Sequence, residues 1–359
     1  MAIVLMVVVH FVENLSGWYD GGQGPFEGVH RVWWLPTGFA APLFTSLSGM
    51  SYRLWADEQA RRGHSGDTIS KRTVRRGLFL IGLGFAFNVL VWLPEDVFNW
   101  DVLTLIGCGL LALDLARRMP DTVVLMWAML VIAVSPAMRL AADYPAYWQS
   151  GYFDYDFTLG DVLLGGLVVG YFPIFPWLAF PLLGHAVANQ LFHAETGTRS
   201  PRIALLGTAG LLVAFTLITI WEKLPAAVTA GATRGWTMFP PSTAYVAGTL
   251  GVVMIGTSFL HRIVDGDPGR WRWLLKWATP LSRHALSMYL LHHVIHVWPL
   301  WAWGAATAGE ATALWQVAMP PAASLGLAAV FLVTAAILFR WLDQRRIPSV
   351  ESLMRWVCD

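Results

Sequence analysis

Charged residues and cysteines are both scarce in this chain. Asp, Glu, Lys and Arg make up 13% of the 359 residues, whereas an ordinary soluble domain carries about 25%. There are two cysteines, Cys108 within an apolar run and Cys358 one residue from the end. This number predicts no disulfide and excludes a metal site built from several thiolates. The composition therefore argues against an ordinary soluble domain.

Several sequence motifs are also missing. The chain has no GxxxxGK[ST] loop and no GxGxxG segment after a strand, so nucleotide hydrolysis and dinucleotide binding lack support. No nucleic-acid-binding signature is present, and we expect no nucleic-acid partner. Met1 opens directly into apolar sequence without a basic region before it, which argues against a cleaved signal peptide.

Long apolar runs are abundant instead. Hydrophobic residues make up 56% of the chain, with 20 Trp and 19 Phe. We therefore expect an all-α, polytopic bundle of about ten transmembrane helices, formed by a single integral-membrane domain over residues 1–359. The expected spans are 1–12, 35–55, 77–93, 102–116, 122–138, 161–190, 203–221, 244–260, 280–303 and 320–340.

Lys and Arg indicate how these spans are oriented. If the loop 53–76 is cytosolic and the later loops alternate, most of the 24 basic residues fall on the cytosolic side, as the positive-inside rule requires. We therefore expect a multi-pass protein of the cell membrane with a cytosolic C-terminus. The first apolar segment has only 12 residues where a span needs about 20, so we also expect that part of the first helix is missing from this chain.

The first segment ends in a polar cluster. His10, Glu13 and Asn14 lie three and four residues apart and so share one face of a helix. Glu13 could orient the imidazole of His10, which would then suit a general base. The alternative is an interfacial histidine that only ends the helix. His30, in the following loop, could cover the mouth of a cavity or be an ordinary exposed loop residue.

The ninth span carries a stripe of polar rings. Thr279 and Pro280 are a good N-cap and first residue for this helix. Its ring-bearing residues recur at helical spacing: Tyr289, His292, His293 and His296. Polar rings are costly in lipid, so we expect this stripe to face the interior of the bundle. His292 and His296 have the i, i+4 spacing of metal ligands, but no acidic or thiolate partner accompanies them, and we expect no metal.

The sixth span contains three prolines, Pro173, Pro176 and Pro181. Proline lacks a backbone donor and clashes with the preceding helical turn, so this span should be kinked or broken. Irregular backbone at membrane depth survives where protein covers it or where it lines a cavity. We expect a cavity beside residues 172–181.

Basic residues gather before the third span. Lys71, Arg72, Arg75 and Arg76 could simply be the positive-inside signal. They could also bind a phosphorylated cosubstrate, because Arg forms bidentate bonds to phosphate. Arg283, in the first turn of the ninth span, allows the same two interpretations.

Six blocks together resemble a known family. VLMVVVHF, APLFTSLSGMSYRL, KRTVRRGLFLIGLGFAFN, FNWDVLTLIGCGLLAL, YFPIFPWLAFPLLGH and PLSRHALSMYLLHHV look like the membrane-bound acyltransferases related to the heparan-alpha-glucosaminide N-acetyltransferase catalytic domain. The resemblance implies transfer of an acyl group from cytosolic acyl-CoA to a sugar amine or hydroxyl on the exoplasmic side. It maps the key histidine onto His10 in the wider superfamily and onto His30 in the heparan-specific branch. The family's Arg and Asp ahead of the first helix have no counterpart here.

The sequence thus predicts an acyl-CoA-dependent O- or N-acyltransferase. The donor is expected to be acetyl-CoA, with Arg72, Arg75, Arg76 and Arg283 around its phosphates. The catalytic group comprises His10, Glu13 and His30, with His292 and Asp101 as weaker partners. Expected partners are membrane lipid and a saccharide or glycolipid acceptor. The two rival interpretations are a secondary transporter, against which the lack of paired interrupted helices argues, and a non-catalytic membrane relative.

Overall fold

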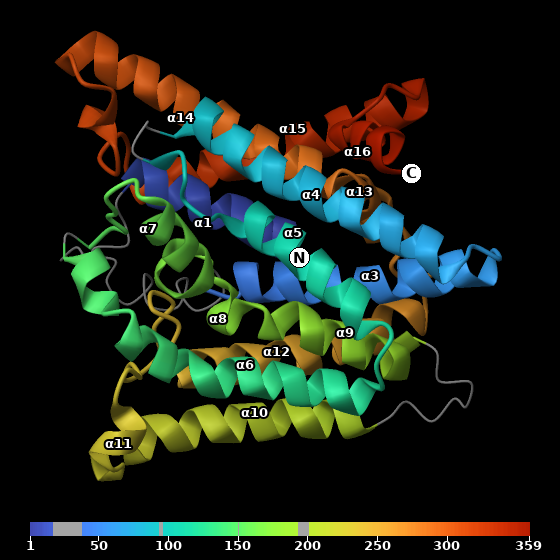
Figure 1. The fold of residues 1–359 in the computed structure, drawn as a ribbon. Helices are drawn as coiled ribbons and strands as arrows, with labels where there is room; N and C mark the ends of the chain where they lie inside the picture. The colour runs from blue at the N-terminus through green and yellow to red at the C-terminus, as the bar shows by residue number, and fades with distance from the viewer. Residues whose placement is uncertain (17–37, 93–95, 150, 193–200) are drawn as a thin grey trace. The chain divides into compact units, whose positions relative to one another are not determined.

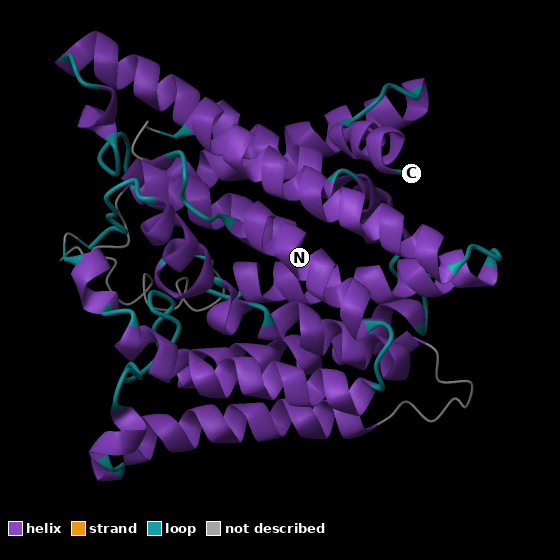
Figure 2. Ribbon diagram, viewed as in Figure 1, coloured by secondary structure: helices purple, strands orange, loops and turns teal. Residues whose placement is uncertain are grey.

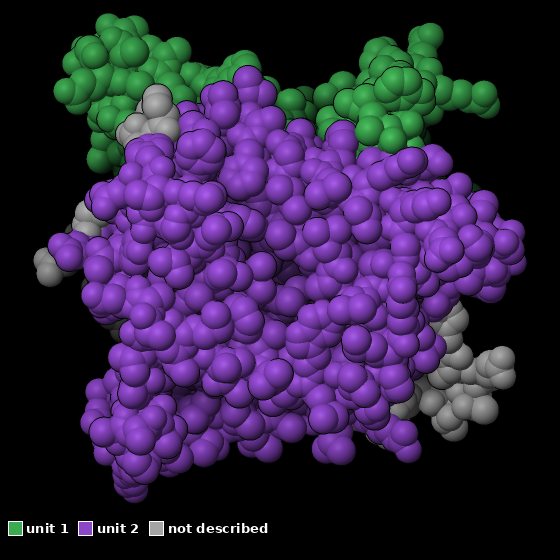
Figure 3. Space-filling model, in the orientation of Figure 1, with its two compact units in different colours: residues 1–41, 267–357 green, residues 42–266, 358–359 purple. Residues whose placement is uncertain are grey.

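The computed structural model describes residues 1–16, 38–92, 96–149, 151–192 and 201–359. The described part consists of helices joined by loops and turns and contains no strand (Figure 2). It divides into two compact units, one formed by residues 1–41 and 267–357 and the other by residues 42–266 and 358–359 (Figure 3). The all-α fold expected from the sequence is confirmed.

Unit 1 joins the first helix of the chain to the last ones. Helix α1 packs against both α14 and α15, and α13 packs against α15, although α1 and α15 stand at opposite ends of the sequence (Figure 1). The elements of unit 1 are α1 (Ala2–Ser16), α13 (Arg272–Arg283), α14 (Ala285–Ala308), η6 (Ala311–Leu314), α15 (Pro321–Arg345) and α16 (Val350–Cys358).

Unit 2 holds the middle of the chain. Its closest helix pairs are α4 with α5 and α10 with α12. The elements of unit 2 are α3 (Ala40–Arg61), α4 (Gly66–Val91), α5 (Val102–Ala116), α6 (Asp121–Ala141), η2 (Tyr144–Trp148), α7 (Leu159–Leu164), η3 (Gly165–Val169), α8 (Ile174–Trp177), α9 (Ala179–Phe192), α10 (Pro201–Ile220), η4 (Trp221–Lys223), α11 (Ala226–Thr229), α12 (Thr243–Leu260) and η5 (His261–Asp265).

Glycine lets helices of unit 2 touch backbone to backbone. A Cβ atom at Gly49 of α3 would collide with the carbonyl oxygen of Pro181, and one at Gly184 of α9 would collide with that of Ser46. Helices in membranes associate through such small residues because lipid supplies little hydrophobic drive between them. Alanine at either position would force α3 and α9 apart.

Six helical segments are long and apolar enough to cross a membrane, counted over the described residues. These are Gly66–Val91, Asp121–Ala141, Leu159–Phe192, Arg202–Lys223, Thr243–Asp265 and Pro321–Arg345. Ala2–Ser16 and Val102–Ala116 are apolar but shorter. The chain is therefore a multi-pass membrane protein, and the expected count of ten spans stays a prediction.

The proline-rich sixth span is broken, as expected. Its residues form α7, η3, α8 and α9 in succession, and Phe175 has non-helical backbone angles. Trp177, Phe180 and Leu182 in this stretch are fully buried. Protein thus covers much of this irregular stretch, which is one of the conditions that permit it at membrane depth; the cavity expected beside residues 172–181 stays a prediction.

The start of the ninth span differs from the expectation. Pro280 lies inside α13, and the helix breaks at His284, so that α14 begins at Ala285. The reason is that His284 leaves the helical region (φ −107°, ψ 35°). Its amide makes the last helical bond of α13, to the carbonyl of Pro280, and its carbonyl accepts the first bond of α14, from the amide of Met288. Thr279 therefore does not cap the histidine-bearing helix.

Candidate functional site

The polar end of α1 presents its side chains toward two other helices of unit 1. Phe11 is fully buried and Asn14 is 4% exposed, while His10 and Glu13 are half-buried. Residues three and four apart share a helical face, so His10 and Asn14 lie on the side of α1 that packs against α14. Phe11 continues this contact by packing on His296 of α14 and Phe331 of α15.

The polar stripe of α14 faces the interior of unit 1, as the sequence predicts. Tyr289, His292, His293 and His296 are each at most 4% exposed. In each histidine the Nδ1 atom lies at hydrogen-bond distance from the carbonyl oxygen four residues earlier, 3.1 Å for His292 to Met288 and 3.3 Å for His293 to Tyr289. A carbonyl oxygen only accepts, so Nδ1 carries the proton and Nε2 has a lone pair.

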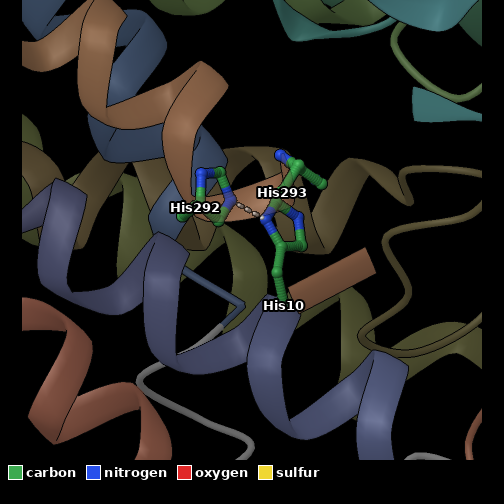
Figure 4. A group of neighbouring side chains, drawn as sticks. All are labelled: His10, His292 and His293. Carbon is green, nitrogen blue, oxygen red and sulfur yellow. Dashed lines mark hydrogen bonds between the residues drawn. The ribbon is translucent and has the colours of Figure 1, made fainter. Parts of the chain in front are cut away.

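His10 joins this stripe through a direct imidazole pair. Its Nδ1 lies 2.8 Å from Nε2 of His292 (Figure 4). Since Nε2 of His292 must accept, His10 donates from Nδ1, and its own Nε2 is left with a lone pair. The chain of bonds from His10 through His292 to the Met288 carbonyl thus fixes the tautomer of His10.

A second pair holds the same helices together one turn further on. Asn14 donates from Nδ2 to Nε2 of His296 at 2.8 Å. The end of α1 is fixed by the segment before α15, where the amides of Gln316 and Met319 donate to the carbonyls of Asn14 and Leu15. The end of α1 that carries His10 is therefore held both by α14 and by the segment before α15.

His10, His292 and His293 could also hold a metal ion. One ring nitrogen from each lies within 4.8 Å of the others, and the ring centroids of His10 and His293 are 4.6 Å apart. Histidine ligands of a metal commonly donate their other nitrogen to a backbone carbonyl, as His292 and His293 do here. From the sequence, His292 and His296 had metal-ligand spacing; the fold instead brings His292 and His293 together with His10 from α1.

Glu13, the expected partner of His10, makes no hydrogen bond to it in the described structure. The Nδ1 atom of His10 is engaged by His292 instead. The expectation rested on the one-turn spacing within α1. Tertiary packing supplied a partner 282 residues away.

Asp101, another predicted site residue, lies outside the histidine cluster. Asp101 belongs to unit 2, where its carboxylate caps α5 by accepting from the amides of Leu103 and Thr104 at 2.9 and 3.0 Å. This is an N-cap role. His30 lies outside the described residues.

The predicted phosphate-binding arginines are divided between the units. Arg72 donates to Gln59 at 2.7 Å, and Arg76 pairs with Asp359 and lies 4.3 Å over the ring of Trp55. Arg75 is exposed. Arg283 belongs to unit 1 and lies 3.7 Å from Asp343.

Sequence reasoning missed an ionic network in unit 2. Arg53 donates to Asp57 and Asp121 at 3.0 and 3.1 Å and lies 3.3 Å from Nε2 of the buried His185. Asn189 also donates to Asp121. The one sign of this network in the sequence is Arg53, a charged residue at the end of an apolar run. The positive-inside pattern explains that arginine equally well.

The family of the chain follows from a comparison with known protein families. The family described as "Heparan-alpha-glucosaminide N-acetyltransferase, catalytic" matches residues 1–219, a stretch that contains His10 and the whole of α3 to α9. No curated protein matches the sequence. Since the match spans more than half of the 359 residues, the chain belongs to the heparan-alpha-glucosaminide N-acetyltransferase catalytic family, which implies a transmembrane enzyme of the acetyltransferase type.

Proposed function

We propose that the chain transfers an acetyl group from acetyl-CoA to an amine or hydroxyl of a saccharide or glycolipid, with His10 as the reacting histidine. Family membership supports the acetyltransferase class. The single observation that carries the choice of residue is the hydrogen bond from His10 Nδ1 to His292 Nε2. It leaves an oriented lone pair on His10 Nε2.

That lone pair can act as a general base. As the acceptor nitrogen or oxygen attacks the thioester carbonyl, its proton moves to His10 Nε2. The C–S bond of acetyl-CoA breaks, the new C–N or C–O bond forms, and the CoA thiolate is then protonated. The same lone pair could take up the acetyl group first, in which case acetyl-imidazole would pass it to the acceptor.

His292 would act as a positioning residue in either route. Its Nδ1–H donates to the Met288 carbonyl, so the ring cannot turn without losing two hydrogen bonds. A histidine held in one tautomer and one orientation is the arrangement that general-base catalysis requires.

The donor would bind through its phosphates. Arg72, Arg75 and Arg76 lie in the first half of α4, and Arg75 is exposed, so this end of the helix offers guanidinium groups to the CoA phosphates. We place this side of the single membrane domain, and the C-terminus, in the cytosol, and His10 toward the exoplasmic side.

A labelling experiment tests the proposal. The purified chain is incubated with radiolabelled acetyl-CoA, with and without glucosamine as a probe acceptor, and free CoA, labelled acceptor and labelled protein are measured. We expect release of CoA that depends on acceptor. Label trapped on wild-type protein but absent from His10→Ala would select the acetyl-histidine route over direct transfer.

Paired variants separate the two candidate histidines. His10→Ala should lose transfer by roughly 10² to 10⁴-fold, and His30→Ala should retain it. His64→Ala, in the turn between α3 and α4, is the control for loss of an unrelated histidine. If His30→Ala is inactive and His10→Ala active, the assignment to His10 is wrong; if wild type neither binds nor cleaves acetyl-CoA, a transporter becomes the better reading.

A further inference from the structure

Helix α13 carries a cationic stripe along a hollow in unit 1. Arg272, Lys276, Thr279 and Arg283 follow one another at intervals of four, three and four residues and so share a face. Together with Arg270 and Asp343 they line a cavity of about 860 Å³. This volume lies within the ~300 to 1,000 Å³ of sites that bind small molecules.

The charge in this hollow is not balanced by the protein around it. It holds four cations and one carboxylate. That carboxylate, Asp343, is shared, because one oxygen lies 3.0 Å from His284 Nε2 and the other 3.7 Å from Arg283. Within the described ranges no ion pair is formed by Arg272 or Lys276. Like charges at i, i+4 repel, so an anion in the hollow would relieve a repulsion that is built into α13.

Large apolar side chains flank the cations. Trp273, which is 66% exposed, itself lines the hollow, and Trp277, which is 42% exposed, lies one turn further along α13. Tryptophan beside Lys and Arg on an amphipathic helix is typical of the membrane–water interface. A soluble nucleotide bound in the hollow would leave the ring of Trp277 in water, whereas a lipid surface would cover both rings.

A second amphipathic helix belongs to the same unit. In α16, Leu353 is 50% and Trp356 is 82% exposed. Its first turn is fixed to α14, because Glu351 accepts from both the amide and the hydroxyl of Ser287, at 2.8 and 2.7 Å. Unit 1 thus offers tryptophans on two amphipathic helices, and one of these helices carries the basic hollow.

We propose that the hollow lined by Arg270, Arg272, Lys276 and Arg283 binds the phosphate of an anionic phospholipid headgroup, with Trp273 and Trp277 in the adjoining interfacial layer. Basic pockets at helix ends on the cytosolic side recognise such headgroups by charge. The proposal does not depend on acetyl transfer. It also assigns Arg283 to lipid rather than to the CoA phosphates.

Lipid titration of the full chain tests this site. Protein purified in neutral detergent is titrated with fluorescent phosphatidylglycerol and, separately, phosphatidylcholine. We expect tighter binding of phosphatidylglycerol that weakens with salt. Arg272→Gln/Lys276→Gln should weaken it about thirtyfold, since each cation near a membrane surface contributes on the order of a fivefold factor.

The matched control is Arg61→Gln/Arg62→Gln, which removes the same charge from exposed arginines that pair with Glu58 in unit 2. It should bind like wild type. Arg272→Lys/Lys276→Arg keeps the charge and should retain binding, which excludes misfolding as the cause. The proposal would be overturned if the two lipids bound equally well, or if the double Gln variant bound phosphatidylglycerol as tightly as wild type.

CoA is the competing ligand. If CoA displaced phosphatidylglycerol, and the double Gln variant no longer bound CoA, the hollow would be assigned to the donor instead.

Discussion

The histidines His185 of unit 2 and His10 of unit 1 have very different neighbours. In unit 2, His185 has Nε2 at 3.3 Å from the Arg53 guanidinium, inside a network that includes Asp57 and Asp121. In unit 1, the nearest polar partner of His10 is another imidazole, whose own proton is held by a backbone carbonyl. Arginine always donates, so the lone pair of His185 Nε2 is occupied, while that of His10 Nε2 is available. The hydrogen-bond partner of a histidine, and not its burial alone, therefore decides whether its Nε2 lone pair is free to act as a base.

The largest expected effect comes from adding a metal to unit 1. Zn²⁺ binds neutral imidazole, and three ring nitrogens already lie within 4.8 Å of one another. Bound Zn²⁺ would displace the shared proton and block the base, so micromolar Zn²⁺ should reduce acetyl transfer to background, with recovery on adding a chelator. His293→Ala should weaken the inhibition while retaining activity. Unchanged inhibition in that variant would show that the metal acts elsewhere.

Replacing the partner of His10 should have the next largest effect. His292→Leu removes the acceptor that fixes the His10 tautomer, and we expect kcat to fall roughly tenfold to a hundredfold with little change in KM. His185→Leu removes a histidine of equal burial and should leave kcat unchanged. Steady-state kinetics of the two variants compares them directly. If both variants lose activity equally, the different hydrogen-bond partners of His10 and His185 do not explain catalysis.

The ionic network of unit 2 should matter for stability rather than for turnover. Arg53→Met leaves Asp57 and Asp121 without their shared donor, and we expect a loss of about 2 kcal/mol in stability. Arg62→Met removes an arginine directly after α3 whose side chain is 64% exposed and should leave Tm unchanged. Thermal unfolding in detergent measures both. Equal Tm values would mean that the Arg53 network does not stabilise the fold.

The smallest expected effect concerns the link between α16 and α14. Burial alone raises the pKa of Glu351, but the hydrogen bonds from the Ser287 amide and hydroxyl outweigh it and hold this pKa below the ordinary 4.5. A carboxyl group with a depressed pKa in the folded state stabilises the protein above pH 4.5, and this contribution is lost as pH falls through the lower, folded-state value.

Glu351→Gln should therefore lower stability by about 1 kcal/mol at neutral pH. Its Tm curve should meet that of wild type as the pH falls below about 4.5. A Tm difference that stays constant down to pH 3 would show that the charge of Glu351 is not what ties α16 to α14.

Much of the fold could be predicted because it depends on interactions between residues within one or two helical turns of each other. The i, i+3, i+4 spacing of Tyr289, His292 and His293 predicted an inward-facing stripe, and all three are buried. Likewise, Pro173, Pro176 and Pro181 predicted the broken helix, because a missing amide donor acts within one turn.

The site could be predicted only in part because its partners are distant in sequence. Helical spacing pointed from His10 to Glu13, whereas the partner that the fold supplies stands 282 residues further on. Topology alone brings α1 and α14 together. The same limit applies to Arg53, whose contacts with Asp121 on α6 and His185 on α9 no local pattern predicts.

The most direct test of the account is the turnover of His10→Gln, measured with acetyl-CoA and a sugar amine beside His64→Gln. Glutamine keeps an amide donor that can reach His292 but has no basic lone pair, so packing is preserved while the base is removed. The account predicts a loss of roughly 10² to 10⁴-fold in kcat for His10→Gln and none for His64→Gln. A His10→Gln enzyme that retains wild-type kcat would contradict it.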